Sequence, residues 1–414
     1  MFSSVSASVS IQSRVLALQL RVLACPRGRL FSTASSSSLR LVTTQRQSGP
    51  HLATRIPSAP YCTLTPPPSG TSLSVIQNYN STMASHPFTH VVVHEMRRLF
   101  PEELADRAWD NVGLLLENSR QPTSATENQR VLLTNDLTPD VVEEAIAYNV
   151  TVIVAYHPII FRGLKSITLQ DPQQASLLKL MQNNIAVYSP HTALDAGHSG
   201  INDWLADTVS TVAKSLGATT PSTTVIKSVR DRMPPSYLAL DHEGKPLDVG
   251  YGRRIQFNHT LPAAEVIRRT VRELGLSMSH VLVAPPRTQQ TKSASLTGLD
   301  DIHSVGVCAG SGFDIFRDQI SKFSMLITGE VSHHDALYAT TRGVWVVCLL
   351  HSNSERKFLS ARLQGELMKQ ITQYTDFKDA VVLVSERDRD PFEIWDLDNP
   401  PTQRTSDRPE AFTI

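Results

Sequence analysis

The chain has 414 residues, of which 41% are apolar, and its 39 basic side chains balance 39 acidic ones. This is the composition of a globular protein with enough chain for one large domain or two, and a net charge of zero argues against a general nucleic-acid binder. No apolar run approaches the ~18–20 residues of a membrane span, and the four scattered cysteines form no CxxC pair, which excludes a disulfide scaffold and a zinc finger.

The charge is unevenly distributed, because the first 88 residues hold seven arginines and no lysine, aspartate or glutamate. Residues 89–414 therefore carry 32 basic and 39 acidic side chains, a net charge of −7. The leader is rich in serine, and its segment 11–23 is amphipathic, with Arg14 and Arg21 on one helical face. These features are typical of a mitochondrial transit peptide. A disordered tail, or upstream sequence wrongly joined to the gene, would have the same composition.

We therefore predict that residues 1–85 form a disordered leader that directs the chain to mitochondria. Its segment Arg29-Leu30-Phe31-Ser32 is similar to a matrix-protease cleavage motif. Initiation at Met83 would discard every leader arginine and give a second, cytoplasmic or nuclear form.

From residue 86 onward, apolar runs with strand and helix periodicity alternate. Helices are predicted over 91–100, 139–148, 175–182, 263–274 and 355–370, and strands over 112–116, 131–134, 150–156, 185–188, 280–284, 304–308, 323–327, 344–350 and 380–385. This alternation indicates an α/β fold with a largely parallel sheet. Residues 216–250 are weaker in pattern and rich in Pro, Ser and Thr. We predict an N-terminal α/β lobe over 86–215, an inserted connecting segment over 216–300 and a C-terminal α/β lobe over 301–414.

Histidines and carboxylates follow several of these predicted strands. His157 comes directly after one predicted strand, and Asp195 lies seven residues after another. His351 comes directly after a third, and Glu355 lies four residues beyond His351. Ligand groups in open α/β sheets gather beyond the carboxyl ends of strands. Imidazole plus carboxylate is the ligand set of zinc, iron, manganese or nickel, so this pattern favours a site for one or two divalent metal ions.

Each of these residues also has a simpler interpretation. His157 alone would usually be a satisfied polar residue in a turn, and Asp195 could serve only as a turn former. His351 and Glu355 could be an i, i+4 pair on a helix surface. The recurrence of such residues at several strand ends is what favours a metal site.

A glycine-rich turn, Gly310-Ser311-Gly312, follows the strand at 304–308 and precedes a short helical pattern. Such a turn can present backbone N–H groups to an anion, which makes it a candidate phosphate-binding turn. It matches neither the P-loop nor the full GxGxxG fingerprint. A tight turn without a ligand is the alternative.

Taken together, the motifs in this chain resemble those of the NIF-three-like (Ngg-one-interacting-factor-three) family, also named GTP cyclohydrolase I type 2. The resemblance runs in order from about residue 90 to 391 and is carried by Trp109-Asp110-Asn111-Val112-Gly113-Leu114, Tyr156-His157-Pro158, His191-Thr192-Ala193-Leu194-Asp195, Cys308-Ala309-Gly310-Ser311-Gly312, Thr328-Gly329-Glu330 with His333-His334, and His351-x-x-x-Glu355. The final segment 385–391 is similar to eukaryotic members in particular.

The resemblance implies a two-lobed α/β fold with a dinuclear metal site between the lobes, and a homo-hexamer built as a trimer of dimers. It implies His157, Asp195, His351 and Glu355 as metal ligands. Bacterial members have a histidine where this chain has Tyr156, and a phenol binds metals less readily than an imidazole. The number of ions, one or two per subunit, therefore depends on this position.

The first function implied is that of a divalent-metal-dependent hydrolase similar to GTP cyclohydrolase I type 2. A bound ion would activate water, His334 or Glu330 would shuttle protons, and the turn at 310–312 would receive a phosphate. The alternatives are a non-catalytic adaptor or transcription co-regulator that binds protein partners, and a metal storage or delivery protein. The acidic body makes direct binding to nucleic acid unfavourable, and no membrane partner is expected.

Overall fold

The structure is a computed structural model that describes residues 86–119, 129–234, 237, 245–276, 281–287 and 301–395. All of them belong to the second of two compact units, Ser58–Ile414. The predicted leader, its amphipathic segment and Met83 lie outside the described residues.

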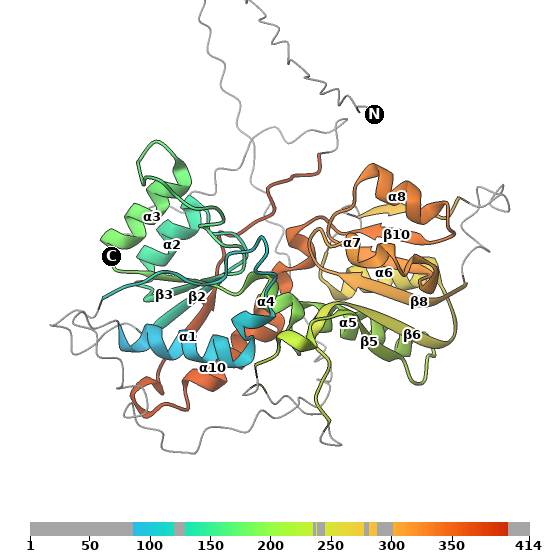
Figure 1. Cartoon of the computed structure of the whole chain (residues 1–414), viewed down its shortest axis with the longest axis horizontal. Coiled ribbons are helices and arrows are strands. Elements are labelled where there is room, and N and C mark those ends of the chain that lie inside the picture. The colour runs from blue at the N-terminus through green and yellow to red at the C-terminus, as the bar shows by residue number, and fades with distance from the viewer. Residues whose placement is uncertain are drawn as a thin grey trace, which may run out of the picture. The chain divides into compact units, whose positions relative to one another are not determined.

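The described residues form a mixed α/β fold with two sheets (Figure 1). The α-helices are α1 (Pro87–Leu99), α2 (Pro139–Ala147), α3 (Pro172–Gln182), α4 (His191–Ala196), α5 (Ile201–Ser215), α6 (Ala263–Glu273), α7 (Asp314–Arg317), α8 (His333–Thr340), α9 (Arg356–Phe358) and α10 (Gln364–Ile371). The strands are β1 (Gly113–Leu116), β2 (Arg130–Thr134), β3 (Val152–Ala155), β4 (Ala186–Ser189), β5 (Ser222–Ser228), β6 (Gly250–Pro262), β7 (Leu282–Ala284), β8 (Asp301–Cys308), β9 (Met325–Thr328), β10 (Trp345–Cys348) and β11 (Val381–Val384). Short 3-10 turns and one π-helical segment, Leu359–Leu363, complete the chain.

The first sheet has five strands in the order β1-β4-β3-β2-β11, all parallel except β1. Its strands are almost wholly apolar because both faces are covered. Val152 and Val154 of β3 pack with α1 in one core cluster, whereas Ile153 and Ala155 pack with α2 and α3 in another. Figure 1 shows α2 and α3 on one side of this sheet and α1 and α10 on the other.

The second sheet has six strands in the order β5-β6-β8-β9-β10-β7. Its central strands β8, β9 and β10 are parallel, and the others pair antiparallel. One face packs against apolar residues of α5 and α6, and the other against those of α7 and α8. The parallel strands of this sheet are therefore also largely apolar and buried on both faces.

The predicted α/β class is confirmed, and the predicted strands and helices match observed ones within a few residues. The exception is the segment 216–300, expected to be a connection. It supplies β5, β6 and β7 to the second sheet and also contains α6, and of these only α6 and β7 match predicted elements. The long strand β6 pairs with both β5 and β8, so these residues are part of the sheet. The C-terminal strand β11 also departs from the expected division, because it pairs with β2 in the first sheet.

The parallel strands position the site, because their carboxyl ends lie at one edge of each sheet. The ladder of the first sheet continues past its strands, where the His157 N–H donates to Asn135 O at 3.0 Å. In the second sheet the Glu330 N–H donates to Gly310 O at 2.8 Å and the Leu349 N–H to Thr328 O at 2.9 Å. Within the described part of the chain, no helix is both long and apolar enough to cross a membrane.

Candidate metal centre

Three of the four predicted ligands converge in the structure. One ligand atom each from His157, His351 and Glu355 lie within 4.8 Å of one another. The Nε2 atom of His157 is 3.6 Å from Glu355 Oε2, and the Nε2 atom of His351 is 3.3 Å from Glu355 Oε1. Both imidazoles thus turn the same ring nitrogen toward one carboxylate, whose side chain is 1% exposed.

The local backbone explains how these side chains meet. His157 lies two residues beyond β3, and His351 lies three residues beyond β10. The chain reverses sharply after β10, with Leu350 in the left-handed region at φ 72°, before the 3-10 turn Ser352–Ser354 leads to Glu355. A non-glycine residue in this region costs energy and persists only where the surroundings hold it. This turn brings Glu355 back to the two histidines.

Carboxylates contact the other ring nitrogen, Nδ1, of each histidine, and an amide contacts the Glu355 carboxylate. Asp136 Oδ1 lies 2.9 Å from His157 Nδ1, and Glu330 Oε2 lies 3.0 Å from His351 Nδ1. Asn135 donates from Nδ2 to Glu355 Oε2 at 3.0 Å. A carboxylate on Nδ1 fixes the ring so that Nε2 is available, which is the usual arrangement around metal-binding histidines.

The same carboxylates shift the histidine pKa values. The hydrogen bond to Glu355, together with the Glu330 carboxylate, raises the pKa of His351 to about 9 despite burial. Burial lowers the pKa of His157, but Asp136 and Glu355 outweigh it and the net direction is upward. Asp136 is partly buried, which raises its pKa, yet its hydrogen bond with His157 keeps the pKa of that carboxyl below its usual value. The site therefore concentrates negative charge that protonated imidazoles, or a cation, would balance.

The residues present fit a divalent ion. Two imidazoles and one carboxylate are a ligand set of catalytic zinc and iron sites, which keep further positions open. The backbone also approaches closely: Gly310 has φ +63°, and a Cβ atom there would lie 2.7 Å from Glu355 Oε1 and 3.2 Å from His351 Nε2. Only glycine leaves this space free.

The fourth predicted ligand, Asp195, lies outside this cluster of described residues. It sits in α4 and accepts a hydrogen bond from Tyr156 Oη at 2.8 Å. Burial raises the pKa of Asp195 to about 6. Burial and the neighbouring Asp195 charge also hold the pKa of Tyr156 well above its usual value, so the phenol stays neutral and donates. Tyr156 thus occupies one oxygen of Asp195.

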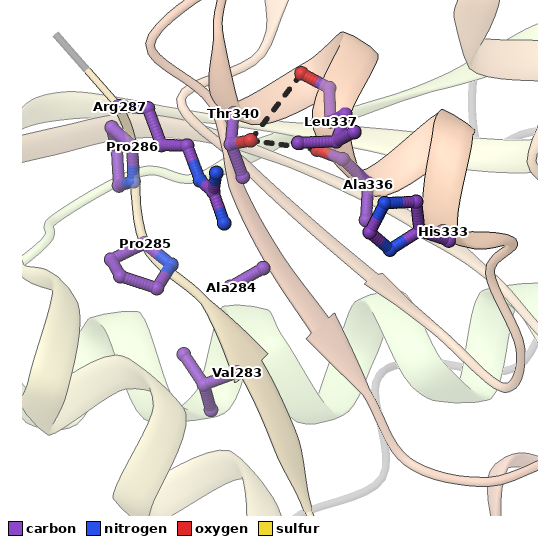
Figure 2. Close-up of a pocket in the computed structure, with 9 residues that line it drawn as sticks. All are labelled: Val283, Ala284, Pro285, Pro286, Arg287, His333, Ala336, Leu337 and Thr340. Carbon is purple, nitrogen blue, oxygen red and sulfur yellow. Dashed lines mark hydrogen bonds between the residues drawn. The ribbon is translucent and has the colours of Figure 1, made fainter.

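The predicted proton shuttles lie in different surroundings. Glu330 is exposed and contacts His351, as described above. His334 is exposed in the first turn of α8, with its ring 5.4 Å from that of His333. His333 lines a pocket with residues 283–287 and other residues of α8 (Figure 2), and none of the three ligand residues is among those that line it.

The turn Gly310-Ser311-Gly312 lies beside the ligand residues. The Gly310 N–H donates to Ser354 Oγ at 2.9 Å, and its carbonyl accepts from Glu330 N. Ser311 is exposed. The following helix α7 has four residues. An added Cβ atom at Gly310 would meet Glu355 and His351 first. A phosphate-binding role of this turn stays a prediction.

The sequence interpretation did not assign roles to Asn135, Asp136 or Asp110. Asn135 and Asp136 directly follow β2, as His157 follows β3, and Thr134 is paired with Ala155 in that ladder. A search for polar residues after every neighbouring parallel strand would have found them. Asp110 pairs with His191 Nδ1, and no sequence spacing indicates a contact across 81 residues.

Comparison with known proteins gives a consistent result. The sequence profile of the family Duf34/NIF3 (NGG1p interacting factor 3) matches residues 89–391. The chain is 40% identical to "Protein NIF3 homolog" of Schizosaccharomyces pombe, over 71% of this chain and 93% of that protein. It is 34% identical to "NGG1-interacting factor 3" of Saccharomyces cerevisiae, over 73% of this chain and 96% of that protein.

The fold has solved counterparts. A Bacillus cereus protein described as related to NIF3 matches with a TM-score of 0.54 at 20% identity, covering 74% of this chain and 98% of that one. The reduced form of HcgD from Methanocaldococcus jannaschii matches with a TM-score of 0.50 at 19% identity, covering 71% of this chain and 96% of that one. These structures share the fold of the chain.

Proposed function

The chain belongs to the Duf34/NIF3 (NGG1p interacting factor 3) family, and on that premise we propose that it binds a divalent metal ion through His157, His351 and Glu355 and acts as a metal-dependent hydrolase. The observation that carries the proposal is the shared orientation of the two imidazoles. Both turn Nε2 toward the buried carboxylate of Glu355. Each Nδ1 atom contacts a carboxylate of its own, Asp136 for His157 and Glu330 for His351.

A divalent ion held there would supply Lewis-acid activation of water or substrate. The residues of the chain would bind and orient it: Glu355 between the two imidazoles, with Asp136 and Glu330 fixing the rings. Glu330 is exposed and pairs with His351, so it can exchange a proton with solvent beside the ligand residues. We assign the proton-shuttle role to Glu330 first and to His334 second.

A second ion would require Asp195. This carboxylate accepts the hydrogen bond from Tyr156 at Oδ1, and its second oxygen, Oδ2, would be the ligand atom. We propose that the first ion binds at the three converging residues and that Asp195 serves a second, weaker position whose strength depends on Tyr156. The proposal includes the location of the metal site between two lobes and the assembly of the chain into a hexamer. The mass of the protein in solution tests the hexamer.

The decisive experiment is metal analysis by mass spectrometry on protein purified without added metal, together with a panel of hydrolase substrates. Glu355→Gln keeps the size of the buried side chain but removes its charge, so bound metal and turnover should both fall to background. Glu103→Gln, which changes an exposed glutamate on the 3-10 turn Glu102–Leu104, is the matched control. Wild-type metal content in Glu355→Gln would refute the metal assignment. Turnover that survives in Glu355→Gln would refute the hydrolase assignment.

The second candidate function is binding to protein partners. It is favoured by the name of the Saccharomyces cerevisiae relative, an NGG1-interacting factor. A chain that takes up metal, hydrolyses nothing in the panel and captures a transcription co-activator component equally well as Glu355→Gln would support this candidate. Exchangeable metal with neither turnover nor partner would instead support metal storage or delivery.

A further inference from the structure

A row of neighbouring aromatic rings extends from the surface to the candidate metal centre. Trp109 is 54% exposed and Phe161 is 43% exposed, and their ring centroids are 6.1 Å apart. The ring of His191 lies 5.8 Å from that of Trp109 and 5.4 Å from that of His157. Two ring-to-ring steps therefore connect an exposed tryptophan with a proposed metal ligand.

Buried polar contacts hold these rings in place. Asp110, next to Trp109, pairs with His191 Nδ1 and accepts the Thr192 N–H at 3.2 Å. Asn111 donates from Nδ2 to the carbonyl of Ile160, which precedes Phe161. The side chains of Asp110 and Asn111 thus tie the segments that carry His191 and Phe161 to the segment that carries Trp109.

The backbone of His191 gives a further sign of constraint. Its φ is 31°, which is rare for a residue other than glycine and is kept only where the surroundings require it. The Asp110 side chain, which is fully buried, and the rings of Tyr156 and Phe161 surround His191 and fix it. The exposed pair therefore stands on a rigid support.

We propose that Trp109 and Phe161 form a binding platform for a planar, conjugated ring of the substrate, presented to the metal centre proposed above. The planes of the two rings are inclined by 53°, so a flat ring can stack on one and meet the other at its edge. An aliphatic group would gain contact area but not these ring–ring interactions. The inference rests on the proposed function, because the proposed metal centre is what would act on the bound ring.

The probe pair is 2-naphthoate and decahydro-2-naphthoate, which carry the same charge on a flat and a puckered bicyclic frame. Binding is measured by ligand-observed NMR titration on the full chain, both metal-free and zinc-loaded. The wild-type protein should bind the flat acid several-fold more tightly. Trp109→Ala should weaken that binding about 5- to 150-fold, the range of losses measured for a stacked aromatic ring. Phe161→Ala should weaken it in the same direction, and Trp109→Phe should restore most of it.

Trp395→Ala is the matched control, since Trp395 is 48% exposed and hydrogen-bonds Glu393. Equal binding of the two acids, or wild-type affinity in Trp109→Ala, would overturn the platform. A smaller mass in solution for Trp109→Ala with unchanged naphthoate affinity would show that Trp109 joins two copies of the chain instead. Zinc affinity is measured in parallel and should be unchanged in Trp109→Ala. A wild-type chain that takes no zinc would refute the metal proposal alone, because the metal-free titration still tests the platform.

Discussion

Gly310 and Glu355 approach each other so closely that the backbone of the first leaves no room for a methyl group beside the carboxylate of the second. An added Cβ would lie 2.7 Å from Glu355 Oε1, closer than such atoms are found in proteins. The glycine in this turn therefore determines the shape of the candidate metal centre, and its substitution offers a direct test.

We expect Gly310→Ala to weaken zinc or manganese binding at least tenfold, because the methyl group displaces Glu355. Alanine is also strained at the positive φ of this position, so the free energy of unfolding should fall by about 1–2 kcal/mol. Gly365→Ala is the matched control, since no atom lies within 4 Å of its added Cβ and alanine favours a helix. Calorimetric titration and thermal unfolding measure both effects. Unchanged metal affinity in Gly310→Ala would show that the ion does not bind at Glu355.

The carboxylate partners of the imidazoles give a second test. Asp136→Asn removes the charge that holds His157 Nδ1, and such a change around a metal-binding histidine typically weakens metal binding about 10- to 100-fold. Asp140→Asn changes an exposed aspartate in the first turn of α2 and should leave the affinity at its wild-type value. Equal affinities in the two variants would remove Asp136 from the site.

Metal binding should release protons. The raised pKa of His351, about 9, means that this imidazole is protonated in the metal-free protein at neutral pH and must lose its proton to bind an ion. Apparent affinity should therefore rise with pH up to about 9 and level off above it. Calorimetry in buffers of different ionisation enthalpy counts the protons released, and an affinity that is independent of pH between 6 and 9 would contradict this.

Tyr156 controls the environment of Asp195. Tyr156→Phe removes the hydrogen bond to a buried carboxylate, so we expect a loss of about 1–3 kcal/mol in the free energy of unfolding. Because the raised pKa of Asp195 is about 6, the loss should be fully present above that pH and should shrink as protonation neutralises the group. Chemical unfolding at pH 5 and pH 8 measures the difference. A loss that is equal at both values would show that Asp195 does not change its charge between pH 5 and pH 8.

Tyr156→His should raise the metal content of the protein. It adds an imidazole beside Asp195, and imidazole is a better neutral donor for zinc-like ions than phenol. We expect the metal content per chain to rise toward two ions, measured by native mass spectrometry. An unchanged content and affinity would mean that Tyr156 lies outside the ligand shell, or that another histidine already fills its place.

The leader gives a prediction of a different kind. We propose two products, a long form imported into mitochondria and trimmed near Phe31 and Ser32, and a short cytoplasmic or nuclear form that begins near Met83. Met83→Leu should remove the short form from the cytosolic fraction. Sequencing of the mature termini from fractionated cells decides the matter, and a long form that stays in the cytosol with its terminus intact would contradict targeting.

Periodicity and strand-end residues predicted much of this structure, because both follow from local rules. His157, His351 and Glu355 each lie just after a buried apolar run, and the strand register then brings them together. The pairing of Tyr156 with Asp195 and of Asp110 with His191 could not be predicted from spacing, because these contacts join segments 39 and 81 residues apart. Strands β5 and β6 were missed because polar residues dilute their apolar pattern: β5 exposes Ser, Thr and Lys, and β6 carries the buried Arg253 and the exposed segment 258–260.

The place of β11 has a consequence for the synthesis of this protein on the ribosome. The strand next to it, β2, is made some 250 residues earlier, yet its outer edge is covered only when Val381–Val384 pair with it. Until then the growing chain presents an uncovered strand edge, which is prone to join other chains. A transcript that ends before this point would therefore yield an aggregating product rather than a smaller working one. Chaperones that shield nascent chains should bind this protein until β11 has been made and has paired with β2.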